Sequence, residues 1–254
     1  FFKLAGIRER TGFNFKKRGR FLTKKIDIPS GYEKKHVARY YMQLLSLFDI
    51  KPKDYGFDLF LSKEDILAAS DILKENGLTS EKKLVLVCPG SGDSWQKTAY
   101  YKRWPESHFL ALIDMLLAEF DCQIVLCGSK QEIYITSQII QKAQKRITDL
   151  TGRLGLMEFA AIMQLSYLVI SNDGGPFHIA QALGKNVLGF FGPVDETVYG
   201  AYPNDSKSII FSSDVDCRPC YKRFRFQGCV HDKKCLRRIE PVKVFNRIKS
   251  TFLF

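Results

Sequence analysis

The sequence predicts an α/β protein in which helices cover both faces of an open, parallel β-sheet. Between residues 84 and 211, short apolar runs alternate with longer segments whose apolar residues recur at helical spacing. The apolar runs are continuous and rich in Val, Ile and Leu, which is typical of strands buried on both faces. The order of strand, helix, strand and helix favours parallel pairing. Because ligands of such sheets bind beyond the carboxyl ends of the strands, the loops at those ends are the candidate sites.

The α/β pattern occupies the centre of the chain, with less regular segments at both ends. Pro105 and Pro241 each open a predicted helix, because proline is tolerated in a first helical turn. We expect strands at 84–88, 123–127, 147–150, 168–171 and 187–191. We expect helices at 36–48, 64–76, 105–120, 131–145, 156–165, 178–183 and 241–252. Residues 1–30 are basic and turn-rich.

The composition is that of a globular protein. Of the 254 residues, 45% are hydrophobic and 26% are charged, which excludes a wholly disordered chain, a collagen-like chain and a coiled coil. The sequence has no uninterrupted run of about 18 apolar residues, so we predict no membrane-spanning helix. Because the sequence does not begin with Met, we expect its true N-terminus to lie further upstream.

Positive charge is concentrated at the two ends of the chain. Residues 1–53 hold 14 basic and 4 acidic side chains, and residues 217–254 hold 11 and 2. The segment between them has a net charge of −7, although the whole chain has a net charge of +12. This distribution favours basic ends that face a phosphorylated lipid, a membrane surface or a nucleic acid. Simple solubility explains the same charge equally well.

The seven cysteines fall into two groups. Those at positions 88, 122 and 127 lie in or beside apolar runs and are expected to be buried thiols in a reducing compartment. Cys217 and Cys220 have the C-x2-C spacing of a metal knuckle, but Cys229 and Cys235 follow at irregular spacing. These four residues are compatible with a structural zinc ion, with disulfides or with free thiols.

The strongest candidate site is the turn at residues 171–178. An apolar strand ends there, Gly174 and Gly175 permit unusual backbone angles, and Pro176 starts a helix. The free N–H groups of a helix start bind phosphate well, and His178 lies close enough to add a donor. Asp173 would accept a hydrogen bond from a ligand. The alternative is an ordinary strand-to-helix turn in which Asp173 caps the helix and His178 lies on the surface.

Two further loops follow predicted strands. After the first, Pro89-Gly90-Ser91-Gly92 permits close backbone approach, and Lys97 or Lys102 would reach an anion at the same edge of the sheet, unless these lysines are simply solvated. After the second, Glu132 would hydrogen-bond ribose hydroxyls or, alternatively, interact with the N-terminus of its own helix.

A set of motifs in a fixed order resembles the ADP-heptose:lipopolysaccharide heptosyltransferases of glycosyltransferase family 9. The motifs are Pro89-Gly90, Lys102-Arg103-Trp104-Pro105, Leu126-Cys127-Gly128 with Glu132, Leu150-Thr151-Gly152, Asn172-Asp173-Gly174-Gly175-Pro176-Phe177-His178-Ile179-Ala180 and Phe191-Gly192-Pro193. The late Cys-x-Pro-Cys segment with Cys235-Leu236 and the final helix also resemble members of that family. The resemblance is densest from residue 84 to residue 200.

The resemblance implies a GT-B architecture, with two Rossmann-like domains and the active site between them. Residues 1–55 are then the end of an N-terminal, acceptor-side domain that is mostly missing, 56–240 the nucleotide-sugar-binding domain and 241–254 a C-terminal helix. The family's proposed catalytic aspartate, the general base, belongs to the segment that this sequence lacks. We therefore expect this chain to bind nucleotide without necessarily being active alone.

The resemblance also implies roles for individual residues. Lys102 would face the donor diphosphate and Asp173 the donor sugar, and these two are the expected catalytic residues. Glu132 would lie near the ribose or base, and Leu154 would pack on the adenine. The diphosphate-binding turn would consist of Gly174, Gly175 and His178, although Gly174 replaces a Thr or Ser found in many members.

The expected reaction is an inverting transfer of a heptose or related sugar from an ADP-sugar to a lipopolysaccharide core or lipid A-linked acceptor. We expect no metal in catalysis, with structural zinc at the four late cysteines as an option. The expected partners are a nucleotide-sugar donor, an anionic lipid-linked saccharide and a membrane surface, but no nucleic acid. The expected location is the cytoplasm, peripherally at the inner face of the bacterial inner membrane. A non-enzymatic basic module that binds RNA or anionic lipid is the alternative.

Overall fold

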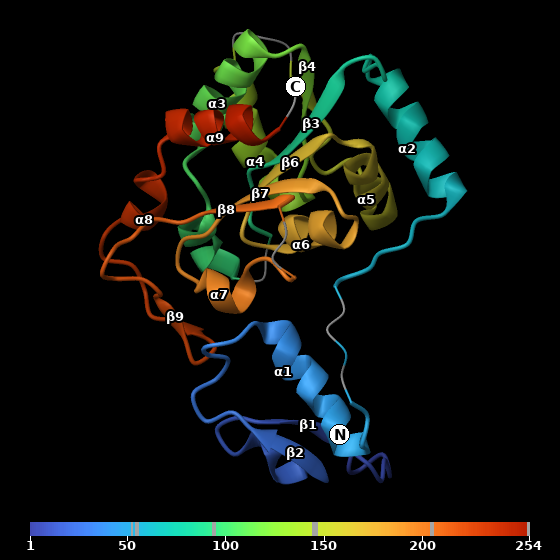
Figure 1. The fold of residues 1–254 in the computed structure, drawn as a ribbon, viewed down its shortest axis with the longest axis vertical. Coiled ribbons are helices and arrows are strands. Elements are labelled where there is room, and N and C mark those ends of the chain that lie inside the picture. Colours follow the sequence, from blue (N-terminus) through green and yellow to red (C-terminus); the bar gives the residue numbers. More distant parts are fainter. Residues whose placement is uncertain (52, 54–55, 93–94, 144–146, 204–205, 253–254) are drawn as a thin grey trace.

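The centre of the molecule is a six-stranded, fully parallel β-sheet (Figure 1). The computed structural model describes residues 1–51, 53, 56–92, 95–143, 147–203 and 206–252. In spatial order the strands are β5 (Thr148–Asp149), β4 (Cys122–Leu126), β3 (Lys83–Cys88), β6 (Leu168–Asn172), β7 (Asn186–Phe190) and β8 (Ser208–Phe211). The predicted α/β class and parallel sheet are therefore confirmed.

The strand order reverses direction between β3 and β6. The chain first adds β4 and β5 on one side of β3, and then returns to add β6, β7 and β8 on the other side. The loops after β3 and β6 consequently diverge at their carboxyl ends, which is the place where open α/β sheets bind ligands. The loops that the sequence analysis singled out lie at this switch point.

Helices cover both faces of the sheet, as predicted. One face packs against α3 (Glu106–Glu119) and α9 (Pro241–Thr251), and the other against α2 (Lys63–Glu75), α5 (Leu156–Leu165) and α6 (Gly175–Ala182). Alternate residues of each central strand enter the two cores, because successive side chains of a strand point to opposite faces.

The largest side chains of the core hold the loop before α3 in place. The Trp104 ring stacks on Phe190 of β7 with 4.0 Å between centroids, and its indole N–H donates to the Ile239 carbonyl at 2.9 Å. Trp104 is fully buried, so burial of its ring contributes about 1.5–3 kcal/mol or more. The residues just before it, including Lys102, therefore lie on a rigid support.

The predicted helices and strands match the observed ones with small shifts in their ends. The segment predicted as a helix over 131–145 begins with a 3-10 turn (Lys130–Glu132) and continues as α4 (Ile133–Ile140), while residues 144 and 145 lie outside the described residues. The elements missed in the second half of the sheet domain include α7 (Glu196–Tyr199) and the edge strand β8. Both contain only four residues and show no periodicity long enough to detect.

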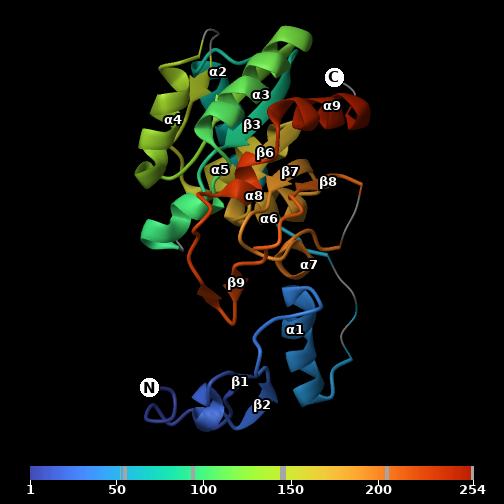
Figure 2. The ribbon, with the colours of Figure 1, turned by 90° about the vertical axis from the view of Figure 1, so that its left-hand side faces the viewer.

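A small lobe formed by the first part of the chain lies beyond the carboxyl ends of the strands (Figures 1 and 2). It contains β1 (Thr11–Asn14), paired in parallel with β2 (Lys24–Asp27), and the helix α1 (Val37–Gln43), which continues as a 3-10 helix (Leu44–Phe48). The prediction of a helix at 36–48 is confirmed, but the two short strands in the turn-rich segment were not foreseen.

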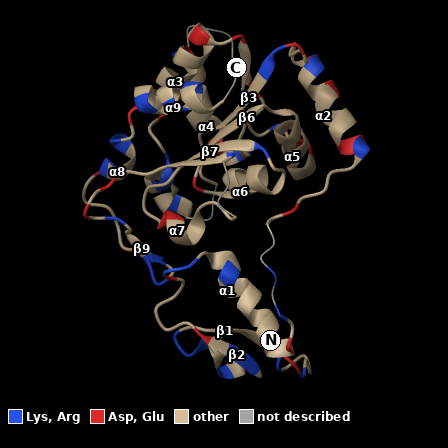
Figure 3. Ribbon diagram, viewed as in Figure 1, with Lys and Arg blue, Asp and Glu red and all other residues tan. Residues whose placement is uncertain are grey.

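A hairpin from the C-terminal part of the chain extends to this lobe. Its strands are β9 (Tyr221–Lys222) and β10 (Arg225–Phe226), and Phe224 at its turn contacts Phe15 and Tyr32 of the lobe. The hairpin of the basic C-terminal segment thus lies against the basic N-terminal lobe, whereas α9 lies at the other end of the molecule, and Figure 3 shows Lys and Arg on both the lobe and the hairpin.

Within the described residues, no helix has both the length and the apolar character needed to cross a membrane.

Candidate functional site

A buried ion pair lies at the switch point of the sheet. Lys102 ends a 3-10 helix (Gln96–Lys102) after β3, and Asp173 directly follows β6. The Lys102 Nζ lies 2.8 Å from Asp173 Oδ2, and each side chain is only 7% exposed. Desolvating two charges costs several kcal/mol per ion, and their mutual attraction offsets this cost only when the geometry is good. The pair is thus held by its surroundings, and it brings together the two residues that the sequence analysis named as catalytic.

Neither alternative reading of these two residues holds. Lys102 is not solvated, and its ammonium group also lies 5.1 Å from the centre of the Trp95 ring. Asp173 does not cap the following helix: Gly174 occupies the cap position without a side-chain hydrogen bond. The buried carboxylate is therefore available for a ligand at the edge of the sheet.

Gly174 and Gly175 start α6 without the unusual backbone angles that we expected. Gly174 has φ 160°, which is extended backbone, and Gly175 is the first helical residue. A Cβ on Gly175 would meet no atom within 4 Å, and one on Gly174 would make ordinary contact, at 3.5 Å, with the Ser91 carbonyl oxygen. The N–H groups of a first helical turn have no partners within the helix, so this turn presents donors to an anion.

His178 lies in α6 beside Asp173, with one ring nitrogen buried and unpaired. Its Nδ1 has no hydrogen-bond partner among the described residues, and its ring lies edge-on to Phe57 with 6.3 Å between centroids. Burial lowers the pKa of His178, and the nearby Asp173 carboxylate opposes this only in part. The neutral ring can donate or accept a hydrogen bond, so His178 is not the satisfied surface residue of the alternative reading.

Glu132 fastens two loops together at the edge of the sheet. Its Oε1 accepts from the Ser91 and Gly92 N–H groups at 2.8 and 2.9 Å. Its Oε2 accepts from the Ser129 N–H and hydroxyl at 2.8 and 3.1 Å. Each oxygen has about two acceptor positions, and all are used. The alternative interaction with the start of its own helix is confirmed and takes the form of a capping box with Ser129, whereas the link to the loop after β3 was not foreseen.

Asn172 is a site residue to which the sequence analysis gave no role. Its amide donates to the carbonyls of Pro89 and Gly90, both at 2.8 Å, and its Oδ1 accepts from the Trp104 N–H at 2.8 Å. One side chain therefore joins the ends of β3 and β6 to the segment that carries Lys102. Its position as the last residue of a buried strand was the available signal, since buried amides are hydrogen-bonded.

Arg103 is a second buried cation at this edge. The residue is 7% exposed, its Nε donates to Ser91 Oγ at 3.2 Å, and its Nη1 donates to the Tyr134 hydroxyl. Among the described residues its guanidinium forms no ion pair with a carboxylate. A buried guanidinium with only neutral partners favours an anionic ligand.

Leu154 lies on the turn after β5, half-buried against the core on the α5 side of the sheet. This turn packs on the loop that contains Glu132, because the Gly152 N–H donates to the Gly128 carbonyl at 2.9 Å. The packing of Leu154 on a base stays a prediction. The other lysine considered, Lys97, is exposed.

The four late cysteines lie in one region of the structure. Burial, followed by the neighbouring Cys217, Cys235 and Cys229 thiols, raises the pKa of Cys220 to about 11. The Cys220 thiol donates to the Cys217 carbonyl at 3.0 Å, and Cys229 Sγ accepts from the Lys233 N–H. The described residues contain no group of His, Cys, Asp or Glu arranged to hold a metal, and these four cysteines are free.

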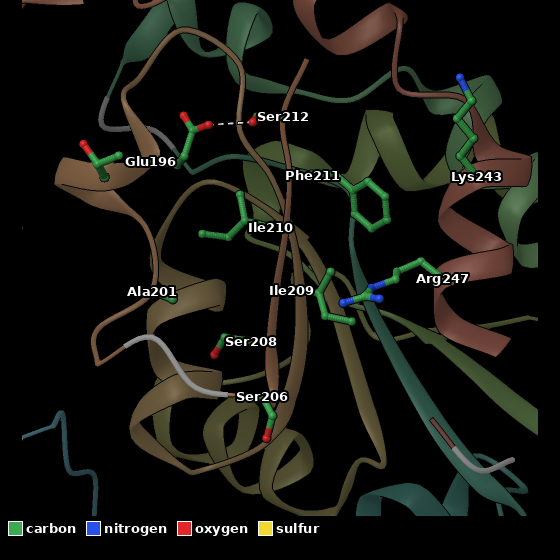
Figure 4. Close-up of a pocket in the computed structure, with 11 residues that line it drawn as sticks. Glu196, Ala201, Ser206, Ser208, Ile209, Ile210, Phe211, Ser212, Lys243 and Arg247 are labelled. Atoms are coloured by element: carbon green, nitrogen blue, oxygen red, sulfur yellow. Dashed lines mark hydrogen bonds between the residues drawn. The ribbon is translucent and has the colours of Figure 1, made fainter. Parts of the chain in front are cut away.

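A cavity of about 950 Å³ lies elsewhere, along the side of the edge strand β8 (Figure 4). Its Glu196 already accepts from the Ser212 hydroxyl and from Arg218, each at 2.6 Å. Because the cavity runs along the strand and not beyond its carboxyl end, we place the functional site at the Lys102–Asp173 pair.

The buried histidines predict that the protein loses stability in mild acid. Burial is the main cause of the lowered pKa of His36, His108 and His178, whose unperturbed value is 6.5. Below pH 6.5 the unfolded chain binds more protons than the folded one, so the stabilisation present above pH 6.5 is lost as the pH falls. We expect a lower free energy of unfolding at pH 5.5 than at pH 7.5 in urea titrations. His178→Gln should reduce this difference, and an unchanged difference would contradict it.

Comparison with known proteins gives consistent matches. The family model described as glycosyltransferase family 9 (heptosyltransferase) matches residues 1–231. A putative glycosyltransferase of Haemophilus influenzae is 28% identical over 159 residues, which cover 61% of this chain and 43% of that protein. The matched segment thus spans less than half of that relative.

Two solved structures share the fold. The family 9 glycosyl transferase of Veillonella parvula has a TM-score of 0.75 and 20% identity, over 96% of this chain and 67% of that one. The Escherichia coli ADP-heptose LPS heptosyltransferase II has a TM-score of 0.74 and 19% identity, over 98% and 71%. The α/β, GT-B-type fold expected from the resemblance is thereby confirmed.

Proposed function

Because the chain belongs to glycosyltransferase family 9, we propose that it binds a nucleoside diphosphate sugar at the switch point of its sheet and transfers the sugar. The observation that carries the proposal is the buried Lys102–Asp173 pair beside the first turn of α6. The Lys102 ammonium group and the open N–H groups of α6 suit the oxygens of a diphosphate, and the Asp173 carboxylate suits the hydroxyls of a sugar.

The same groups would stabilise the leaving diphosphate. When an acceptor hydroxyl attacks the anomeric carbon, its proton passes to a general base, a role that the family resemblance gives to an aspartate of the acceptor-side domain. The bond from the anomeric carbon to the diphosphate oxygen breaks, and negative charge develops on the diphosphate. Lys102 and the first-turn N–H groups of α6 are positioned in advance, so they need little reorganisation as this charge appears. Asp173 would orient the sugar, and attack from the opposite side would invert the anomeric centre. This chemistry uses no metal.

The surrounding residues would hold the rest of the donor. Arg103 would add a second cation for the phosphates, and His178 a donor or acceptor from α6. Leu154 would pack against the base. Glu132 would accept from a ribose hydroxyl only by releasing one of the N–H groups it now holds, so we assign it mainly to positioning of the two loops.

The names of the relatives support a particular kind of donor and acceptor. The name of the Escherichia coli structure includes ADP-heptose and LPS, and we propose an ADP-sugar donor and an anionic, lipid-linked saccharide acceptor for this chain. Such an acceptor would place the protein at a membrane surface, at the cytoplasmic face of the inner membrane. The basic lobe and hairpin would face this acceptor, with residues 1–55 as the acceptor side, 56–240 as the donor side and 241–254 as a closing helix.

Nucleotide-dependent thermal stabilisation tests the donor site in the chain as it stands. A ligand that binds only the folded state stabilises it by about 2.7 kcal/mol at 100 times its Kd. We expect ADP to raise the Tm by several degrees and AMP, which lacks the diphosphate, to raise it much less. Equal effects of ADP and AMP, or stabilisation by RNA alone, would contradict the proposal.

A further inference from the structure

A basic pocket lies where the N-terminal lobe meets the β9–β10 hairpin. Its volume is about 380 Å³, within the range of about 300–1,000 Å³ found for small-molecule sites. Its lining residues come from two parts of the chain that are far apart in sequence: Phe13, Phe15, Lys16, Arg18, Ile28, Tyr32, Arg223, Phe224 and Arg225. The pocket is separate from the Lys102–Asp173 pair.

Aromatic side chains form the support of this pocket. The Phe224 ring at the hairpin turn packs edge to face on Phe15 and Tyr32, with 4.8 and 4.9 Å between the ring centroids. Phe15 is buried, and Gly31 allows the close approach, since a Cβ there would lie 3.3 Å from the Arg223 Cα. These packed rings fix the hairpin against the lobe, because edge-to-face aromatic pairs are favourable beyond the burial of their surface.

Four cations line the pocket, and none of them forms an ion pair with a described carboxylate. Lys16 and Arg18 come from the turn after β1, and Arg223 and Arg225 come from the hairpin. All four side chains are exposed, and together they give this part of the surface a positive potential that attracts an anion.

The backbone is also held in an uncommon conformation around the cations. Lys16 and Lys17 have φ 50° and 63°, and Arg223 and Phe224 have φ 51° and 58°. Left-handed backbone is uncommon for residues other than glycine and persists only where the surrounding structure holds it. The packing of the rings maintains this geometry on both sides of the pocket.

We propose that this pocket binds the phosphate monoester of a phosphorylated sugar on the acceptor, an assignment that rests on the proposed transferase function. A phosphate monoester carries a charge of about −1.5 to −2 at pH 7, which suits several cations better than a carboxylate does. The guanidinium groups of Arg223 and Arg225 can each donate two hydrogen bonds to phosphate oxygens. The aromatic walls would pack on the apolar face of the sugar ring, and the small volume suits one sugar phosphate better than a polymer.

Binding of two probes tests the proposal with the whole chain. Glucose 6-phosphate in solution is measured by calorimetry against glucose, and phosphatidic acid vesicles are measured against phosphatidylglycerol vesicles of equal charge. We expect both monoester probes to bind more tightly than their partners. Arg223→Asn/Arg225→Ala, with Asn chosen because it tolerates left-handed backbone, should weaken monoester binding at least tenfold. Lys16→Asn/Arg18→Ala, on the other wall, should do the same.

The matched control is Arg238→Ala/Arg247→Ala, which removes the same charge from exposed positions outside this pocket. It should change monoester binding less than twofold. Equal losses in the control and pocket variants would show general charge attraction and overturn the proposal, as would no preference for monoesters or tighter binding of RNA than of monoesters. Binding of glucose 6-phosphate alone, without vesicles, supports the pocket and identifies a soluble source.

These experiments can contradict the pocket proposal and the donor-site proposal independently of each other. The pocket variants should keep a wild-type melting temperature to within about 2 °C and the full ADP-induced increase. Loss of the ADP effect in the wild-type protein would contradict the donor site, whereas retained monoester binding in the pocket variants would contradict the pocket.

Discussion

Lys102→Ala is expected to abolish the ADP-induced rise in melting temperature. The ammonium group lies at the switch point, 2.8 Å from Asp173, and no other described lysine reaches that carboxylate. Under the proposed function the same change should lower the turnover of sugar transfer about 10²- to 10³-fold, the usual effect of losing one preorganised group that stabilises developing charge. Calorimetric titration with ADP and a sugar-transfer assay measure the two effects.

The substitution should also destabilise the fold, because it leaves Asp173 buried without its partner. Breaking a buried pair from one side costs about 3–5 kcal/mol. Asp173→Ala should cost a similar amount, and the double variant should cost less than the two single variants added together. The double variant separates the roles: recovered stability with no ADP binding supports a binding function for the pair. Wild-type ADP affinity in the double variant would exclude Lys102 from the donor site.

Gly90→Ala is expected to have the second largest effect, although it adds only one methyl group. The new Cβ would collide with Glu132 Oε1, and this carboxylate has no open space to enter because Gly128 lies on its other side. Glu132 would have to leave the N–H groups of Ser91, Gly92 and Ser129. Each buried donor left unsatisfied costs about 1–3 kcal/mol, so we expect a large fall in Tm together with weaker ADP binding.

Gly175→Ala is the matched control for this change. Its Cβ would enter open space, and its helical backbone suits alanine, so stability should be unchanged or slightly higher. Thermal unfolding of the two variants with and without ADP makes the comparison. If both variants melt at the same temperature, the Glu132 link between the loops does not hold the site together.

The fold was predictable where local signals were strong. The strands at 84–88 and 168–171 are continuous apolar runs, and α3 and α9 each follow a proline, so their type and approximate ends could be read from the sequence. Short elements such as β1, β2 and β8 depend on pairing partners distant in sequence, which leave no periodicity in four residues. The N-terminal lobe was therefore described only as basic and turn-rich.

The site was predictable at the level of loops but not of contacts. The order of strands and loops placed Lys102 and Asp173 at one edge, but the ion pair between them depends on the packing of Trp104 against Phe190. The roles of Asn172 and Glu132 could not be read from spacing, because their partners are backbone groups of other loops. The expectation of unusual backbone angles at Gly174 and Gly175 was wrong, because glycine permits an unusual φ but does not require it.

The ion pair at the switch point has a consequence for turnover under the proposed function. Before the donor arrives, Asp173 already serves as the counterion of Lys102, so the incoming diphosphate replaces an existing partner and does not meet a bare cation. The net gain in electrostatic energy on entry is then the difference between two attractions, which keeps the nucleotide product from being held too tightly. The nucleoside diphosphate product can dissociate as Asp173 re-forms its ion pair with Lys102, and the site is then ready for the next donor.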